Sequence, residues 1–236
     1  MELARSIAGV LVIGTLGWLA SPAAAALNPN SPKILLHVRS VTTKNLCSVP
    51  ELDNNCANTN QRGDLSPTSI ASHLLVLVDR GDSLSSMDGL DRVQFGIDYQ
   101  GGYNPSGFMR PINVWSWIFC ATLQFDSQSP LWPRPGSGTL ITWNTCQQSR
   151  LVCTGYFYMT AYGPANFGLT KRPSDGIAKV TTCASQDVLL TEGALGLAAF
   201  SAGAITTGCN PCLRDCAPDP VAAREATWSR VKSLID

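Results

Sequence analysis

Residues 151–162 read LVCTGYFYMTAY, a segment dominated by β-branched and aromatic side chains. Side chains of a strand alternate between two faces, and here both faces are apolar. The alternation predicts one face with Cys153, Gly155, Phe157, Met159 and Ala161, and the other with Val152, Tyr156, Tyr158, Thr160 and Tyr162. A strand this long and this apolar needs neighbours on both edges, so we expect it at the centre of a sheet.

Further strand patterns flank this segment. Lys33–Val41 alternates, and Ser72–Asp79 contains the unbroken apolar run of a strand that is buried on both faces. Arg92–Tyr99 alternates most regularly, with Val93, Phe95, Ile97 and Tyr99 directed inward and Arg92, Gln94, Gly96 and Asp98 directed outward. Short strands between Gly- and Pro-rich turns, without alternating helices, predict an all-β fold. We expect an antiparallel β-sandwich of Ig-like or cohesin-like architecture with a short C-terminal helix.

The chain divides into three predicted parts. Residues 1–26 have a basic residue, Arg5, an apolar core and a run of small residues, as secretory signal peptides do. The apolar core is shorter than the roughly 20 residues that span a bilayer. Residues 27–216 form the predicted disulfide-stapled sandwich, and residues 217–236 form a linker and an amphipathic helical appendage. This organisation predicts a secreted protein, extracellular or periplasmic, with no membrane span after cleavage of the signal peptide.

The charge of the chain is sparse and balanced. Lys and Arg number 17, Asp and Glu also number 17, and charged residues are 14% of the 236 residues. Nucleic-acid surfaces need clustered Lys and Arg to neutralise phosphates, and this chain has no basic run. We therefore expect no nucleic-acid partner. The sequence also gives no reason to expect a cofactor.

All nine cysteines lie downstream of the predicted signal peptide, as expected for disulfides of an exported protein. Six are candidates for particular disulfides: Cys47, Cys56, Cys120, Cys146, Cys183 and Cys212. Their positions favour the pairs Cys47–Cys56, Cys120–Cys146 and Cys183–Cys212. Because nine is an odd number, we expect one cysteine to be free or to pair between chains.

Two metal-site patterns compete with purely structural roles. Cys209, Cys212 and Cys216 have the spacing of a redox or zinc motif, but an oxidising compartment and the lack of a nearby histidine favour disulfides. Oxygen-bearing residues of the type that binds calcium gather in the first long loop: Asp53, Asn55, Asn58, Asn60 and Asp64. Their spacing does not follow an EF-hand loop, so no metal site is predicted.

The stretch Gly81–Leu84, GDSL, follows an apolar strand and resembles the nucleophile segment of GDSL-type esterases. That resemblance implies Ser83 as the nucleophile of a secreted serine hydrolase. A serine of this kind needs a base within hydrogen-bond reach. The esterase family supplies the base from a downstream Asp-x-x-His, whereas both histidines of this chain, His37 and His73, lie upstream. The hydrolase is the alternative prediction.

Aromatic residues give the sequence's main indication of a binding surface. Tyr156, Tyr158 and Tyr162 share one face of the predicted central strand, and Trp132 lies in a Pro- and Gly-rich loop. Exposed aromatic rings bind sugars or proteins, because rigid rings bury a large area at a low entropy cost. We therefore predict a binding site at these four residues for a glycan or a cell-surface protein. The competing interpretation is that the rings fill the core.

The C-terminal segment Thr227–Lys232, TWSRVK, resembles the Thr-Trp-x-x-(Val/Ile)-Lys-x-Leu tails of uncharacterised secreted bacterial β-sandwich proteins. The strand segments at Phe95–Ile97 and Gly155–Tyr158 are also similar to that group. The resemblance implies export and no particular activity. The tail would either dock on the sandwich or act as a sorting tag for a partner. The sequence as a whole predicts a secreted, non-catalytic binding or surface-structural module.

Overall fold

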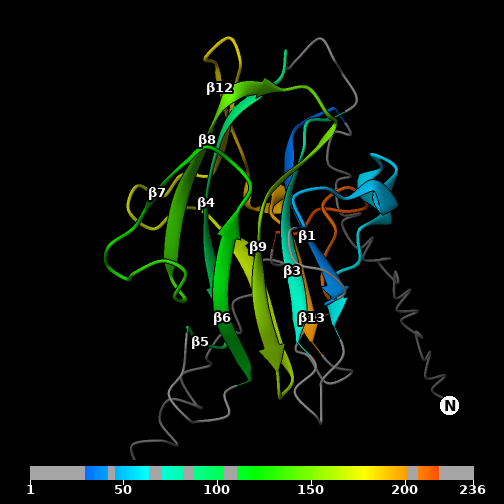
Figure 1. The fold of residues 1–236 in the computed structure, drawn as a ribbon, viewed down its shortest axis with the longest axis vertical. Coiled ribbons are helices and arrows are strands. Elements are labelled where there is room, and N and C mark those ends of the chain that lie inside the picture. Colours follow the sequence, from blue (N-terminus) through cyan, green and yellow to red (C-terminus); the bar gives the residue numbers. More distant parts are fainter. Residues whose placement is uncertain are drawn as a thin grey trace, which may run out of the picture.

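The computed structural model describes residues 30–41, 46–63, 71–81, 88–103, 111–200 and 207–217 (Figure 1). The predicted signal peptide, the predicted C-terminal helix, Asp64 and Ser83 lie outside these ranges. No helix within them has the length and the apolar character that crossing a membrane requires.

The described part of the chain is built from strands and three short 3-10 helices, with no α-helix. The strands are β1 Lys33–Ser40, β2 Arg62–Gly63, β3 Ser72–Asp79, β4 Leu90–Tyr99, β5 Gly101–Tyr103, β6 Ile112–Phe119, β7 Leu123–Asp126, β8 Ser137–Gln147, β9 Leu151–Ala161, β10 Ala165–Thr170, β11 Lys179–Thr182, β12 Asp187–Leu189 and β13 Leu197–Phe200. The 3-10 helices are η1 Pro50–Leu52, η2 Cys56–Asn58 and η3 Glu192–Ala194. The predicted all-β fold is confirmed.

Strand β9 is the middle strand of the first sheet, as its apolar faces predict. The order of this sheet is β1-β3-β9-β6-β5. Its pairs are antiparallel except β5 with β6, which run parallel at the sheet edge. The sheet is therefore mainly antiparallel, as the predicted antiparallel sandwich implies, with one parallel pair at its edge.

The second sheet is organised around β4. One edge of β4 pairs with β8, which in turn pairs with β7. The other edge pairs with β10 and with β11 at different points along the strand. Strand β10 continues to β13, and β13 pairs with β2 in parallel. The two sheets lie face to face, as Figure 1 shows.

The core between the sheets is aromatic at its centre. Phe157 of β9 is fully buried, and its ring centroid lies 4.9 Å from that of Phe167 on β10. Trp117 and Trp132 pack against Phe157 at 4.4 and 5.8 Å between ring centroids. Tyr99 stacks on Phe167 at 4.7 Å. Ring contacts of this kind hold the sheets together through large buried areas.

The period-two prediction for β9 is wrong on one side of Thr154. Val76 of β3 lies opposite Gly155 while Leu77 lies opposite Cys153, so Thr154 is an extra residue, a β-bulge. One extra residue reverses the faces of everything before it. Val152 therefore joins Phe157 in the core between the sheets, and Cys153 lies with Tyr156 on the outer face.

A second, smaller core covers part of that outer face. Side chains of β1, β3 and β9 meet a cap formed by η1, η2 and the segment around Cys212. The residues of this second core include Leu35, Leu46, Leu52, Leu75, Leu77, Leu151, Cys153 and Tyr156. The sheet is thus apolar on both faces because each face has its own cover.

The disulfides fasten this cap and the ends of the sheets. The four bonds are Cys47–Cys120, Cys56–Cys212, Cys146–Cys183 and Cys209–Cys216, and Cys153 is the free cysteine. All six candidate cysteines form disulfides, but the three predicted pairs are wrong. Those pairs joined neighbours in the sequence, whereas the sheets bring together cysteines up to 156 residues apart.

The outward side of β4 is partly covered by the turn of residues 171–177. Gln94 lies on the outer face, as predicted, but this turn buries it. Its amide donates to Asp175 Oδ1 and to the carbonyl oxygen of Ile177, each at 3.2 Å. The turn fits closely because Gly138 of β8 has no side chain. A Cβ there would lie 2.5 Å from Arg172 Cγ. The rest of this face stays open.

Candidate functional site

The four predicted binding aromatics do not lie on one exposed surface. Trp132 is 6% exposed in the core between the sheets, and Tyr156 is 4% exposed in the second core. Tyr162 is half-buried just beyond β9. Tyr158 is 37% exposed on the outer face of the first sheet. Two of the four rings therefore contribute to packing.

Tyr158 has an exposed aromatic neighbour on the adjacent strand. Tyr158 pairs with Ser116 of β6, and Trp115 beside it is also 37% exposed. Trp115 Nε1 donates to Thr160 Oγ1 at 3.1 Å, which fixes the indole on the same face as Tyr158. Trp115 occupies a register shift of β6, and the regular period that sequence patterns rely on does not predict its direction. Trp115, Tyr158, Thr160 and His73 are called the aromatic face below.

His73 supports the aromatic face from β3. Its ring lies 5.1 Å from that of Tyr156 and 5.8 Å from that of Tyr158 between centroids. Burial, and secondarily the charge of Arg39, lowers the pKa of His73 below its ordinary value. Burial thus favours the neutral form of the imidazole beside the two tyrosine rings.

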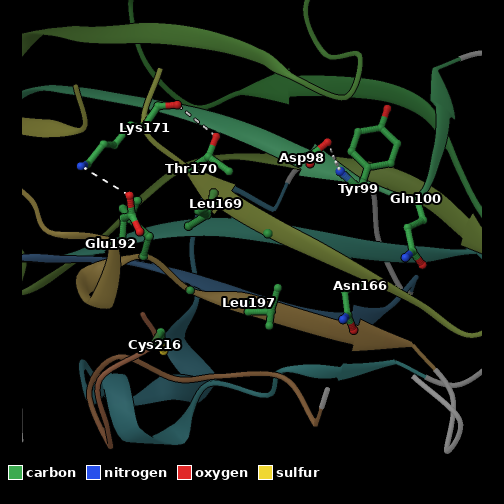
Figure 2. Close-up of a pocket in the computed structure, with 13 residues that line it drawn as sticks. Asp98, Tyr99, Gln100, Asn166, Leu169, Thr170, Lys171, Glu192, Leu197 and Cys216 are labelled. Atoms are coloured by element: carbon green, nitrogen blue, oxygen red, sulfur yellow. Dashed lines mark hydrogen bonds and ion pairs between the residues drawn. The ribbon is translucent and has the colours of Figure 1, made fainter. Parts of the chain in front are cut away.

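The open part of the second sheet's outer face forms a concave site. This site, called the sheet groove, has a volume of about 530 Å³ and crosses β4, β10 and β13 (Figure 2). Its lining residues are Asp98, Tyr99, Gln100, Asn166, Gly168, Leu169, Thr170, Lys171, Glu192, Leu195, Gly196, Leu197 and Cys216.

Strand register builds the floor of the sheet groove. Asp98, Gly168 and Leu197 lie directly opposite one another on the three strands and so face the same side. Asn166 and Thr170 flank Gly168 at intervals of two residues on β10 and share that side. Gly168 has no side chain to fill the groove. A Cβ at this position would lie 3.2 Å from Leu197 Cδ1, on the groove side of the sheet.

Polar groups stand at both ends of the sheet groove (Figure 2). At one end, Lys171 Nζ lies 3.5 Å from Glu192 Oε1. At the other end stand Asp98, Gln100 and Asn166. Asn166 Oδ1 is shielded from solvent and accepts no hydrogen bond from the described protein groups. A shielded amide oxygen without a partner is costly, so Asn166 gains a hydrogen bond if its side chain turns this oxygen toward a donor of the ligand.

The lining of the sheet groove suits hydrogen bonding rather than covalent chemistry. It contains neither a histidine nor a free thiol, since Cys216 is bonded to Cys209. The sequence predicts that Asp98 faces outward. It gives no indication of Asn166 and Gln100 as site residues, because their convergence depends on which strand lies beside which.

Both histidines have structural surroundings of their own, and Ser83 lies outside the described residues. His73 packs against the rings of Tyr156 and Tyr158. His37 is buried, its Nδ1 accepts from the Asn60 amide at 2.9 Å, and burial lowers its pKa.

The metal-site alternatives have other roles in the described residues. Cys56 and Cys212 lie beside the carboxylate of Asp79, but the two sulfurs are bonded to each other and are not thiolate ligands. Cys209 pairs with Cys216, so no thiols remain for the zinc or redox interpretation. In the first loop, Asn55 Oδ1 caps η2 by accepting from the Ala57 amide at 3.0 Å.

Comparison with known proteins gives little. No protein-family model matches the chain, and no curated protein is similar to it at a significant level. Among solved structures, the chain is similar to a cohesin module from Clostridium perfringens ATCC13124 family 33 glycoside hydrolase. The TM-score is 0.42 with 8% sequence identity, over 72% of this chain and 97% of that one.

Proposed function

We propose that this protein is a secreted, non-catalytic binding module that holds a glycan in the sheet groove. The observation that carries the proposal is a concave site whose two ends are polar and whose floor is kept open by Gly168. Its volume of about 530 Å³ is that of a small-molecule pocket. Four disulfides support an oxidising compartment, since such bonds persist outside the cytosol.

The polar groups favour a sugar over a strongly charged ligand. The amides of Asn166 and Gln100 each offer both donors and an acceptor, and the carboxylate of Asp98 accepts. Sugar hydroxyls both donate and accept, so they complement this set. Lys171 and Glu192 neutralise each other at the far end. The groove therefore has no surplus of positive charge to hold a phosphate or sulfate.

A glycan array with the purified protein tests this proposal. We expect enrichment of particular glycans and about a tenfold or larger loss of affinity for Asp98→Ala, since hydrogen bonds to charged groups contribute about 1.5–3 kcal/mol. For Asn166→Ala we expect about a two- to tenfold loss, since neutral hydrogen bonds contribute about 0.5–1.5 kcal/mol. Asp91→Ala is the matched control, because Asp91 is also on β4 but outside the groove. An array without any enriched glycan, or binding that survives both groove substitutions, would refute the proposal.

A second candidate is protein binding through the aromatic face. Trp and Tyr are the residues that most often dominate protein interfaces, and Trp115 and Tyr158 are exposed side chains on adjacent, well-paired strands. Retention of an envelope protein on the immobilised chain would be lost in Trp115→Ala and Tyr158→Ala. Phe125→Ala, on the outer side of β7, is the control with a comparably exposed ring. Equal retention by all three variants excludes the aromatic face.

The hydrolase remains the competing enzymatic hypothesis. Hydrolysis of a p-nitrophenyl ester by the wild-type protein, abolished by Ser83→Ala, would establish it in place of the binding proposal.

A further inference from the structure

Three sulfur atoms form a cluster where β6 ends beside β9. Cys120 is bonded to Cys47, and the free Cys153 has its Sγ 3.9 Å from Cys120 Sγ. All nine cysteines lie in the described residues, and Cys153 is the one that the four disulfides leave over. A free thiol thus stands next to a disulfide sulfur.

The three cysteines differ in their access to solvent. Cys153 is buried in the second core, Cys120 is half-buried and Cys47 is exposed in the cap. The buried Cys153 thiol lies beside Cys120. Attack on Cys120 would therefore release Cys47, the exposed member of the disulfide.

We propose that Cys153 is an internal exchange thiol: its sulfur attacks Cys120, the disulfide moves to Cys120–Cys153, and Cys47 becomes a surface thiol that is open to covalent modification. The approach requires the Cys120 and Cys153 sulfurs to close from 3.9 Å to a bond length of about 2.05 Å.

The step balances without an oxidant or a reductant. Cys153 loses its proton, its thiolate forms the bond to Cys120 Sγ, and the Cys47–Cys120 bond breaks. The electron pair of the broken bond leaves on Cys47, whose sulfur then takes up a proton from solvent. The number of disulfides is four before and after the exchange.

The surroundings of Cys153 make the exchange strongly dependent on pH. Burial raises the pKa of Cys153 to about 12, with a hydrogen bond to Gly155 opposing this shift and the charge of Glu51 adding to it. The reactive thiolate fraction therefore rises about tenfold per pH unit up to that value. An exposed thiol has an ordinary pKa of about 8.5, so rising pH also favours the form with Cys47 released.

Removal of the competing partner tests the geometry. In Cys47→Ser we expect a Cys120–Cys153 disulfide, seen as a linked peptide by mass spectrometry, and no free thiol in the denatured, unreduced protein. Cys183→Ser is the matched control: it leaves Cys146 without a partner, so that two thiols are counted, those of Cys146 and Cys153. Free thiols at both Cys120 and Cys153 in Cys47→Ser would overturn the proposal.

Alkylation of the intact protein tests the exchange itself and does not depend on the folding of a variant. The oxidised wild-type chain is treated with iodoacetamide under native conditions at pH 7, 8 and 9. We expect alkylation at Cys47 that accelerates about tenfold per pH unit and is at least a hundredfold slower in Cys153→Ser. Modification of Cys153 with the Cys47–Cys120 bond intact, or no modification of Cys47, would contradict the exchange.

Discussion

At the scale of single residues, the type of an aromatic side chain does not determine whether it is buried or exposed. Phe157, Trp132 and Tyr156 are chemically suited to a binding surface, yet each is buried. Tyr158 of β9 and Trp115 of the adjacent β6 are partly exposed. Residue type alone does not distinguish these roles. Tyr156 and Tyr158 share one face of β9 and differ because the second core covers only Tyr156, while the register shift at Trp115 sets the direction of that indole.

Removal of the central ring has a predictable cost. Phe157→Ala should lower the free energy of unfolding by about 3–5 kcal/mol, because it leaves a cavity among Trp117, Trp132 and Phe167. Urea denaturation measures the change. Phe125→Ala, with a ring that is 55% exposed, should change stability by less than about 0.5 kcal/mol. Similar losses in the two variants would mean that Phe157 is not at the centre of the core.

Histidine burial predicts a dependence of stability on pH. The pKa of His37 and of His73 is lower in the folded protein than the ordinary 6.5, chiefly because of burial. Below pH 6.5 the unfolded chain therefore binds more protons than the folded chain, so stability falls as the pH falls through that window. Urea denaturation at pH 7.5 and 5.5 should show this loss, and His73→Gln should reduce it. An unchanged difference in His73→Gln would contradict the prediction.

At the scale of elements, the strands are predictable and their irregularities are not. The apolar patterns of β3, β4 and β9 follow from the sequence, as does the outward direction of Asp98. The bulge at Thr154 is invisible to a period-two pattern, since β9 is apolar on both faces and either register looks satisfactory. Only pairing with β3 distinguishes the two registers.

The bulge itself gives a test at this scale. Deletion of Thr154 makes the pairing with β3 regular, with Cys153 still opposite Leu77 and Gly155 still opposite Val76. Leu151, Val152 and Cys153 then keep their faces, so we expect the near-UV circular dichroism of the native fold to persist. Thr154→Ala keeps the residue count and loses only the hydrogen bond from Thr154 Oγ1 to the Val76 carbonyl, 3.0 Å long. That variant should fold, with a cost of about 1–3 kcal/mol. Loss of the native near-UV signal in the deletion variant, with Thr154→Ala still folded, would contradict this prediction.

The residues of the sheet groove are likewise not predictable from the sequence. Its floor combines β4, β10 and β13, which lie far apart in the sequence, and Asn166 contributes because β10 lies between the other two. Gly168→Leu should fill the groove and abolish ligand binding while leaving the strand pairing intact. Binding by Gly168→Leu equal to that of the wild type, in the glycan array described above, would place the ligand elsewhere.

At the scale of the whole molecule, we expect the disulfides to contribute unequally to the free energy of unfolding. Cys56–Cys212 joins residues 156 apart and fastens the cap to the C-terminal segment, whereas Cys146–Cys183 joins residues 37 apart. In the chain-entropy model a longer loop restrains the unfolded chain more. Replacement of both cysteines by serine should therefore cost about 1 kcal/mol more for the first pair than for the second. Urea denaturation of the two double variants measures the difference, and an equal or reversed order would contradict the model.

The sequence by itself determined the all-β class, the central position of β9 and the use of cysteines in disulfides, because composition and the alternation of side chains act locally along the chain. The tertiary structure alone decided the disulfide partners, the buried or exposed state of each aromatic ring and the residues that meet in the sheet groove. These depend on contacts between segments far apart in the sequence. Such contacts are set by strand order and by single-residue bulges, neither of which leaves a periodic signal in the chain.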